Sequence, residues 1–362
     1  MKLGTFHILQ QPEGKSPSQV YADNLEQFRV ADELGFHEIF LGEHRISQYG
    51  TLPNPLVLAG AISQVTKRIR IGTAVIIPAF SHPVRVAEEV AMTDVLTGGR
   101  FDLGVGRGYQ RREFEAMGVS QDESAPRFYE SVEIIDRLLH EEHVTYHGQF
   151  WDVNDVTVYP RPERNISIGV AVFKTQATFD FAVKKGYNIL AGNPYSIQPE
   201  IEGSYKEYLA ALRRAGHAED TEKAWGLAGT FVDPNRDKAR TIAFADSQAY
   251  MAQLGQHGSV TGPDGKIPVG YEHHADTWWK AWGEHLSEGA YDLPSSLVGT
   301  PDEVIEKLHR MHEEFGFKNV VMTINQGGTI PQREVLRTFE LIAEKVMPAV
   351  RDLGAPVSTV AS

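Results

Sequence analysis

Short apolar segments alternate with longer amphipathic ones along most of the chain. Eight of the short segments are rich in Val, Ile, Leu and Phe, as the buried strands of a parallel sheet are. These eight segments cover residues 2–9, 38–43, 69–77, 101–106, 167–173, 188–191, 225–232 and 319–324. Apolar residues spaced by three or four positions predict helices between them. The predicted helices cover about 18–34, 55–65, 83–97, 126–140, 176–185, 199–215 and 332–346, with one more opening at Pro234.

Eight strands with interleaved helices predict an α/β fold, a (β/α)8 TIM barrel formed by a single domain over residues 1–362. A doubly wound parallel sheet is the alternative, because the right-handed crossover rule permits both. Two segments interrupt the alternation and indicate insertions. Residues 144–159 have the pattern of a hairpin. Residues 255–297 follow the seventh strand, and we expect them to form a lid over the carboxyl end of the barrel.

Composition and charge narrow the possible functions. The chain has 35 basic and 48 acidic residues, which gives a formal net charge of −13. Such a surface repels nucleic acid and anionic lipid, so neither is expected as a partner. The absence of cysteine excludes disulfides, thiolate metal sites and a cysteine nucleophile. Because the sequence shows neither a signal peptide nor an apolar span, we expect a soluble, cytoplasmic protein.

Chemically reactive residues follow two of the predicted strands. In a barrel of this class the catalytic residues lie at the carboxyl ends of the strands. The fourth strand ends in three glycines around Arg107, and the second ends in Glu43 and His44. Glycine lets a planar or phosphorylated ligand approach the backbone, and arginine supplies a positive fork beside it. These strand ends predict a site for a flat aromatic ligand with a phosphate tail.

His44 is the predicted acid–base group, because histidine titrates near neutral pH without a large perturbation. A hydrogen-bonded structural histidine is the alternative. Glu43 either orients His44 or forms a salt bridge with Arg45. Arg107 needs an anion, which is either a ligand phosphate or a carboxylate of the barrel such as Glu43.

The start of the helix after the fifth strand is the predicted phosphate site. Its free N–H groups and the helix dipole favour an anion, and Lys174, Thr175 and Thr178 add a cation and two hydroxyls. The alternative is that Thr175 is an ordinary N-cap and Lys174 is solvated. Arg127, early in the helix after the fourth strand, either joins Arg107 at the phosphate or faces solvent.

Other catalytic patterns fail on spacing. The glycines of 104–108 do not form the dinucleotide-binding fingerprint, because Tyr109 takes the place of its last glycine. His140 and His143 are three residues apart, whereas the zinc-binding helix needs histidines four apart. A Gly-x-Ser-x-Gly nucleophile elbow is absent. No metal site is therefore predicted.

Five longer motifs occur in a fixed order along nearly the whole chain. They are Leu41-Gly42-Glu43-His44, Ile71-Gly72-Thr73-Ala74-Val75, Ser81-His82-Pro83-Val84-Arg85, the stretch 99–108, and Val298-Gly299-Thr300-Pro301-Asp302-Glu303. Together they resemble the bacterial luciferase-like (alkanal monooxygenase-like) family of flavin-dependent monooxygenases. The resemblance implies a TIM barrel that binds reduced FMN (FMNH2) at its carboxyl mouth.

The resemblance also implies a two-component reaction. A separate flavin reductase would supply FMNH2, O2 as co-substrate would add at the flavin C4a, and the resulting peroxide would oxygenate a small organic substrate. His44 matches the family's catalytic histidine, with Glu43 beside it. The flavin-binding positions are Ala74 and Val75, often joined by a cis peptide under the ring, Tyr109 beside the ring, and Arg107, Arg127, Lys174, Thr175 and Thr178 at the phosphate.

Three positions depart from the luciferases. Those enzymes carry a reactive cysteine where this chain has Gly106, an acid at Lys174 and commonly a histidine at Arg45. The differences argue against a long-chain aldehyde substrate and against light emission. An uncharged or weakly polar substrate is expected instead. The apolar residues that would shape its pocket are Val75, Ile76, Tyr109, Trp278, Trp279 and Trp282. For the tryptophans the favoured alternative is packing within the lid or at an interface.

Two other functions remain open at this stage. One is hydride transfer with deazaflavin F420, which relatives use on the same barrel. The other is a non-catalytic flavin-binding subunit, although retention of His44 argues against it. The family likeness also implies a homodimer, because its members pair through helices near the first strands.

Overall fold

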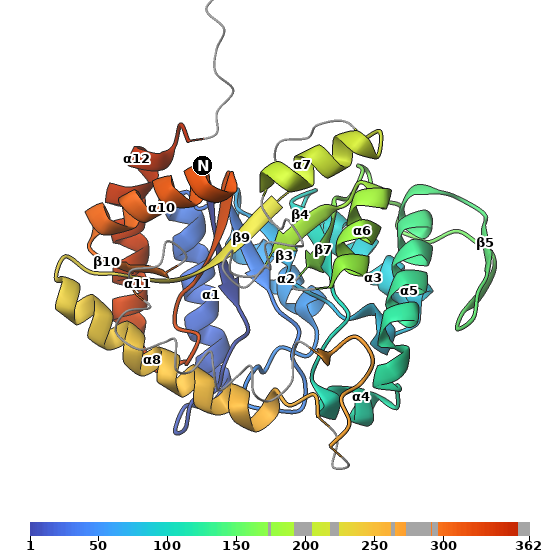
Figure 1. Ribbon diagram of the computed structural model, residues 1–362, viewed down its shortest axis with the longest axis horizontal. Helices are drawn as coiled ribbons and strands as arrows, with labels where there is room; N and C mark the ends of the chain where they lie inside the picture. Colours follow the sequence, from blue (N-terminus) through green and yellow to red (C-terminus); the bar gives the residue numbers. More distant parts are fainter. Residues whose placement is uncertain are drawn as a thin grey trace, which may run out of the picture.

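The computed structural model describes residues 1–172, 175–191, 205–217, 224–261, 265–272, 291 and 296–353. Eight parallel strands close into a barrel with helices around it (Figure 1). Around the barrel they are β1 (Lys2–His7), β2 (Glu38–Leu41), β3 (Arg70–Thr73), β4 (Phe101–Val105), β7 (Ile168–Val172), β8 (Asn188–Ala191), β9 (Ala224–Val232) and β11 (Asn319–Thr323). β8 pairs with β9, which joins the two ends of the strand order β9-β11-β1-β2-β3-β4-β7-β8, and this closure excludes the doubly wound sheet.

Helices follow the strands on the outside of the barrel. They are α1 (Pro17–Leu34), α2 (Pro55–Val65), α3 (Pro83–Leu96), α4 (Arg111–Met117), α5 (Ser124–His140), α6 (Gln176–Lys185), α7 (Tyr205–Arg214), α8 (Arg236–His257), α10 (Pro301–Phe315), α11 (Gln332–Leu341) and α12 (Met347–Val350). Local chemistry sets several of their ends. Gly35 ends α1 in the left-handed conformation, and Thr300 and Glu303 form a capping box at α10. No helix among the described residues has the length and apolar character needed to cross a lipid bilayer.

The predicted insertions correspond to particular elements. The hairpin is confirmed as β5 (Val144–His147) paired with β6 (Asp152–Val156). The predicted lid overlaps two regular elements, because 255–257 form the last turn of α8 and β10 (Ser296–Gly299) begins within it. β10 pairs in parallel with the end of β9, outside the closed barrel. The sequence did not predict this strand.

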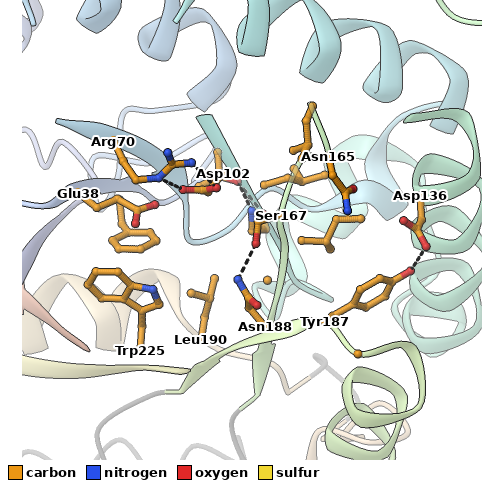
Figure 2. Close-up of a pocket in the computed structure, with 18 of the residues that line it drawn as sticks. Glu38, Arg70, Asp102, Asp136, Asn165, Ser167, Tyr187, Asn188, Leu190 and Trp225 are labelled. Atoms are coloured by element: carbon orange, nitrogen blue, oxygen red, sulfur yellow. Dashed lines mark hydrogen bonds and ion pairs between the residues drawn. The ribbon is translucent and has the colours of Figure 1, made fainter. Parts of the chain in front are cut away.

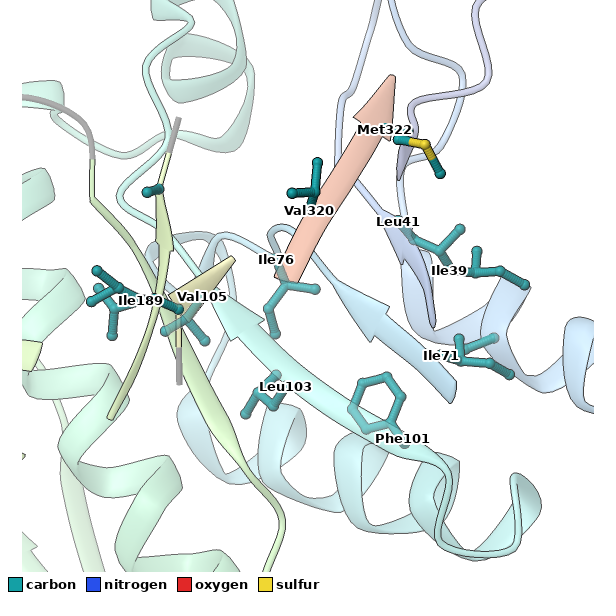
Figure 3. Packing of buried hydrophobic residues seen from close by; sticks show 14 of the residues in the cluster. Ile39, Leu41, Ile71, Ile76, Phe101, Leu103, Val105, Ile189, Val320 and Met322 are labelled. Atoms are coloured by element: carbon teal, nitrogen blue, oxygen red, sulfur yellow. The ribbon is translucent and has the colours of Figure 1, made fainter. Parts of the chain in front are cut away.

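Side chains alternate between two apolar layers along each strand. Ile39, Leu41 and Ile71 point outward and are buried under the helices (Figure 3). Phe40 and Trp225 point into the barrel and pack together there. This alternation is typical of TIM barrels, and it leaves the loops at the carboxyl ends of the strands to carry polar groups.

Candidate active site

The carboxyl end of the barrel collects most of the predicted site residues. His44 follows β2, the Ala74–Val75 peptide follows β3, and Arg107 follows β4. In Figure 1 the strands run from the labelled N-terminus at the top toward this lower end, where α4 and the last turns of α8 lie. The mouth is therefore bounded by loops far apart in sequence.

The imidazole of His44 lies in a polar and aromatic pocket. Its Nδ1 is 3.3 Å from Oε1 of Glu113 and 3.2 Å from Nε2 of Gln110. The rings of Tyr49 and Tyr109 meet the imidazole edge-on, with centroids 4.7 and 5.9 Å away. The carboxylate of Glu113 accepts a proton from Nδ1, whereas the amide nitrogen of Gln110 donates to an unprotonated Nδ1, so the two contacts belong to opposite tautomers of the ring. In the tautomer that Glu113 favours, Nε2 is the basic nitrogen.

Glu113 is the functional candidate that sequence reasoning missed. Its side chain is only 1% exposed, although it belongs to the short helix α4. Oε1 accepts a hydrogen bond of 2.7 Å from the backbone N–H of Arg45, next to His44. Oε2 is buried and has no hydrogen-bond partner within the described part of the chain. The only signal in the sequence was an acidic residue shortly after the strand end that carries Arg107. Nothing in the sequence connects this acid to a histidine 69 residues away.

Glu43 supports the loop rather than the imidazole. Its Oε1 accepts a 2.7 Å bond from Nε of Arg45, and its Oε2 accepts a 3.1 Å bond from the backbone N–H of Ile77. Burial raises the pKa of Glu43, while the guanidinium of Arg45 opposes that rise. The salt bridge with Arg45 that the sequence allowed is thus present. Because Glu43 is engaged by Arg45, it is not the partner of Arg107 either.

Three tyrosine hydroxyls form a chain beside His44. Tyr109 donates to Tyr49 over 3.2 Å, and Tyr49 and Tyr250 share a bond of 2.9 Å. Burial raises the pKa of all three phenols, so they remain neutral at physiological pH. Tyr250 belongs to α8, so this chain connects the catalytic end of the barrel to the helix that precedes the predicted lid.

The backbone between β3 and β4 has the form that the resemblance implied. The Ala74–Val75 peptide is cis, and the carbonyl of Val75 accepts the N–H of Glu43 over 3.0 Å. A Cβ atom at Gly106 would lie 2.5 Å from Cγ2 of Val75. The packing therefore leaves no room at position 106 for the cysteine that the luciferases carry there.

Arg107 has unused hydrogen-bonding capacity at the mouth. Its Nη2 donates to Oγ of Ser124 over 3.2 Å, and its guanidinium lies 4.7 Å from the ring centroid of Tyr271. Nε is buried and has no hydrogen-bond partner among the residues that the structure describes. Within the described ranges Arg107 forms no ion pair with a carboxylate either. A half-buried guanidinium of this kind is suited to an anion.

Tyr271 connects the predicted lid to this arginine. Its hydroxyl donates to the carbonyl of Gly108 over 2.7 Å and lies 3.0 Å from Oγ of Ser124. Tyr271 is 2% exposed, although its segment follows α8. The described part of the segment therefore packs directly against the arginine-bearing loop.

The start of α6 has the geometry of an anion site. Thr175 is the N-cap residue, but its side chain makes no capping hydrogen bond. Its carbonyl accepts the N–H groups of Thr178 and Phe179, which are the first hydrogen bonds of the helix. The backbone N–H groups that come before Thr178 in the first turn lie ahead of these helical hydrogen bonds. Thr178 is buried, with its hydroxyl 3.3 Å from that of Tyr129. Lys174 lies outside the described residues.

Arg127 is engaged by neighbouring side chains. It donates to Oε2 of Glu123 over 2.9 Å and lies 4.3 Å from the ring centroid of Phe150. Helix α5 nevertheless connects the two anion-binding features. Its first residue, Ser124, contacts Arg107, and its Tyr129 contacts α6. The side chains present thus fit a phosphorylated ligand held between the β4 loop and α6.

Comparison with known proteins establishes the family. Residues 1–318 match the family model of the luciferase-like monooxygenases, and the chain belongs to this family. The oxygenase component of the flavin-dependent trigonelline monooxygenase from Acinetobacter baylyi is 24% identical, over 96% of this chain and 95% of that protein. The protein is accordingly an enzyme of the luciferase-like, flavin-dependent class.

Solved structures share the barrel. Monooxygenase RslO1 from Streptomyces bottropensis is 28% identical and superposes with a TM-score of 0.81, covering 96% of this chain and 99% of its own. The oxygenating constituent of 3,6-diketocamphane monooxygenase from Pseudomonas putida, in complex with FMN, is 18% identical with a TM-score of 0.74, covering 96% and 98%. An F420-dependent secondary alcohol dehydrogenase is 19% identical with a TM-score of 0.72, covering 97% and 99%. The last two show the fold alone.

Proposed function

We propose that this protein is the oxygenase component of a two-component monooxygenase that uses FMNH2 and O2 to oxygenate a small organic molecule. A separate flavin reductase would deliver the FMNH2. The observation that carries the proposal is that Arg107 and His44 lie at the same mouth of the barrel, and that Nε of Arg107 is buried with no hydrogen-bond partner among the described residues. Reduced flavin, when bound, supplies the electrons that activate O2.

Different residues of the mouth would bind the phosphate, support the flavin ring and transfer a proton. Arg107, Thr175 and the first-turn amides of α6 would bind the flavin phosphate, with Lys174 and Arg127 as further candidates. Ala74 and Val75 would support the ring, and Tyr109 would border it. His44, held at Nδ1 by Glu113, would take up or deliver a proton at Nε2.

The substrate class follows from the lining of the mouth. The neutral phenols of Tyr49 and Tyr109 lie against His44, so an uncharged or weakly polar molecule would lose little hydration beside them. Residues 255–297 would form a lid within the single domain, and Tyr271 already contacts the arginine loop. The lid tryptophans Trp278, Trp279 and Trp282 lie outside the described residues.

The choice between FMN and F420 distinguishes this proposal from its alternative. F420 is the alternative because an F420-dependent alcohol dehydrogenase has the same fold. The experiment measures the affinity of the purified protein for reduced FMN and for reduced F420. Preference for FMN, with O2 consumption that depends on substrate and on a flavin reductase, would support the oxygenase. Preference for F420, with hydride transfer and no O2 uptake, would refute it.

His44 provides the test of catalysis against simple flavin binding. His44→Ala should stop substrate-dependent O2 uptake while the affinity for FMN stays unchanged, because the residue faces the mouth without joining the phosphate contacts. A wild-type protein that binds flavin but shows no turnover with any reductase and substrate would instead indicate a non-catalytic subunit.

We also propose a homodimer formed through α2 and α3. These neighbouring helices carry exposed apolar side chains, and a Cβ atom at Gly60 of α2 would lie 3.9 Å from Cδ1 of Leu96 of α3. The apolar patch that we assign to them consists of Val57, Val65, Met92, Val95 and Leu96. Apolar side chains gathered on adjoining helices are typical of association sites.

A further inference from the structure

Polar side chains gather at both ends of the barrel, but their hydrogen bonds are matched differently. At the amino end, pairs of them border a cavity of about 980 Å3 and satisfy one another (Figure 2). Arg70 binds Asp102 there, and Tyr187 donates to Asp136 over 2.6 Å. At the carboxyl end, Nδ1 of His44 faces a carboxylate and an amide nitrogen together. One protonation state of a neutral imidazole cannot satisfy both of these partners.

The two partners of Nδ1 are both held in place. Oε1 of Glu113, 3.3 Å from Nδ1, is fixed by the 2.7 Å hydrogen bond from the backbone N–H of Arg45. Nε2 of Gln110, 3.2 Å from Nδ1, belongs to a residue that is only 1% exposed. The carboxylate therefore favours a proton on Nδ1, while the amide N–H favours a proton on Nε2 of the ring.

The neighbouring phenols determine which way the amide of Gln110 points. Tyr109 donates its one hydroxyl hydrogen to Tyr49 over 3.2 Å, so its oxygen accepts from Gln110. Nε2 of Gln110 donates to that oxygen over 3.4 Å. Because the amide nitrogen has two hydrogens, the second is available to Nδ1 of His44. A reversed amide would instead need Tyr109 to donate to its oxygen.

The tautomer decides what His44 presents to a ligand in the mouth. Within the described residues both hydrogen-bond partners of the imidazole lie at Nδ1, which leaves Nε2 for the ligand. With the proton on Nδ1, Nε2 accepts a hydrogen bond, and with the proton on Nε2 it donates one. A ring that reaches both forms can act as a base and as an acid without first becoming a cation.

We propose that Gln110 is a positioning residue that opposes Glu113 and keeps both neutral tautomers of His44 populated, with the hydroxyl of Tyr49 orienting its amide through Tyr109. The use of both tautomers in oxygenation rests on the proposed function. The tautomers themselves are a property of the protein without flavin, so they are tested separately from flavin binding and turnover.

The tautomers of His44 are measured by 15N NMR on the full chain, labelled at histidine and free of flavin. Protonated and unprotonated imidazole nitrogens have distinct chemical shifts. The chain has 14 histidines, so the signals of His44 are identified as those lost in His44→Gln. A pH series upward from about pH 7 identifies the neutral ring. We expect both neutral tautomers in the wild type, and a single tautomer would overturn the proposal.

Gln110→Met removes the amide and nearly keeps its shape. It should lower the ratio of the Nε2–H to the Nδ1–H tautomer about tenfold, the worth of one hydrogen bond. Glu113→Gln should raise the ratio, because an amide oxygen is a weaker acceptor than a carboxylate. Gln121→Met is the matched control, because Gln121 is also buried and donates to the backbone carbonyl of Tyr109 over 2.8 Å. A ratio unchanged in Gln110→Met, or changed equally in Gln121→Met, would contradict the role of Gln110.

Tyr49→Phe tests the orientation of the amide. It keeps the ring that meets His44 edge-on at 4.7 Å and removes only the hydroxyl that accepts from Tyr109. The hydrogen of Tyr109 is then available to Gln110, which can turn its amide oxygen toward Nδ1–H. The ratio should therefore fall as in Gln110→Met, although Tyr109 and Gln110 separate that hydroxyl from Nδ1. Circular dichroism and thermal melting confirm that each variant is folded. An unchanged or increased ratio in folded Tyr49→Phe would overturn the role of Tyr49.

Discussion

At the scale of single residues, the environment of His44 is set by the buried carboxylate of Glu113, which belongs to another element. Glu113 binds the backbone N–H beside His44 and faces Nδ1 of its ring. Glu43, the nearer residue in sequence, is instead held by Arg45 and Ile77. We therefore regard Glu113 as a positioning residue, which acts on the reaction through the orientation and charge of the imidazole.

Glu113→Gln should lower kcat on the order of tenfold or more and leave the affinity for FMN unchanged. Glutamine can still accept the N–H of Arg45, but a neutral amide cannot balance a positive imidazolium. Steady-state O2 uptake and flavin titration measure the two effects. Glu115→Gln is the matched control, because Glu115 lies on the same helix, is 59% exposed and pairs with Arg111. Equal losses in both variants would contradict the role of Glu113.

Glu38 makes the stability of the fold depend on pH. Its pKa in the folded protein is raised by burial above the ordinary value of 4.5. Above that pH the folded state retains a proton that the unfolded state has released, so the free energy of unfolding falls as pH rises. Each tenfold gain in proton affinity corresponds to about 1.4 kcal/mol lost by the time Glu38 ionises.

Glu38→Gln should remove this decline, because glutamine resembles the protonated acid and cannot ionise. Urea denaturation across the range upward from pH 4.5 compares the variant with the wild type. The gain in stability of the variant should grow with pH and then level off. Glu33→Gln, on the exposed face of α1, serves as control. A gain independent of pH would show that Glu38 titrates normally.

Residue-level prediction from the sequence succeeded where position along a strand was enough. His44 and Arg107 were placed at the mouth because the carboxyl ends of parallel strands meet there. Glu113 and Tyr250 were missed, because their partners at the mouth are distant in sequence and come together only through α4 and α8. Glu38 was predicted only as the start of a strand, since its raised pKa comes from burial in the folded barrel and from the charge of Asp102.

At the scale of elements, the eight barrel strands were predictable because each is a continuous apolar run. Helix α4 and strand β10 were not predicted. α4 has seven residues, four of them charged, and β10 has four residues within a segment that lacks periodicity. Tertiary contacts define β10, as the ammonium of Lys307 donates to the carbonyls of Ser296 and Val298 over 2.8 and 2.9 Å.

At the scale of elements, we predict that the flavin phosphate binds at the start of α6. Thr175→Val should weaken FMN binding about 10- to 100-fold, the worth of one hydrogen bond to a charged group. Binding of riboflavin, which lacks the phosphate, should be unchanged. The variant should remain stable because the hydroxyl makes no capping bond. Thr241→Val on α8 is a control for the substitution itself. An equal loss of affinity for FMN and for riboflavin would show that the phosphate does not bind at this helix start.

At the scale of the whole molecule, the two ends of the barrel have separate chemistry. The carboxyl mouth holds His44 and Arg107, and the amino end holds the buried Glu38 near the Arg70–Asp102 ion pair. The sequence predicted the barrel and kept the open sheet as the alternative, because closure depends on each of the eight strands pairing on both sides, β8 with β9 included. No local pattern encodes that pairing. The motif order along the chain, matched by the family model, carried more information than any single segment.

The apolar patch on α2 and α3 carries the last prediction, which concerns assembly. Val57 is 72% exposed and Leu96 is 52% exposed, which is costly for large aliphatic side chains unless a second copy covers them. In a two-fold interface each substitution occurs twice, so Val57→Glu with Leu96→Glu would place like charges in an apolar contact. Light scattering after size exclusion should then change from the mass of two chains to that of one. Val269→Glu is the matched control, because Val269 is also 72% exposed but lies far along the chain near Tyr271. A wild-type monomer, or a dimer that survives the double substitution, would place the association surface elsewhere.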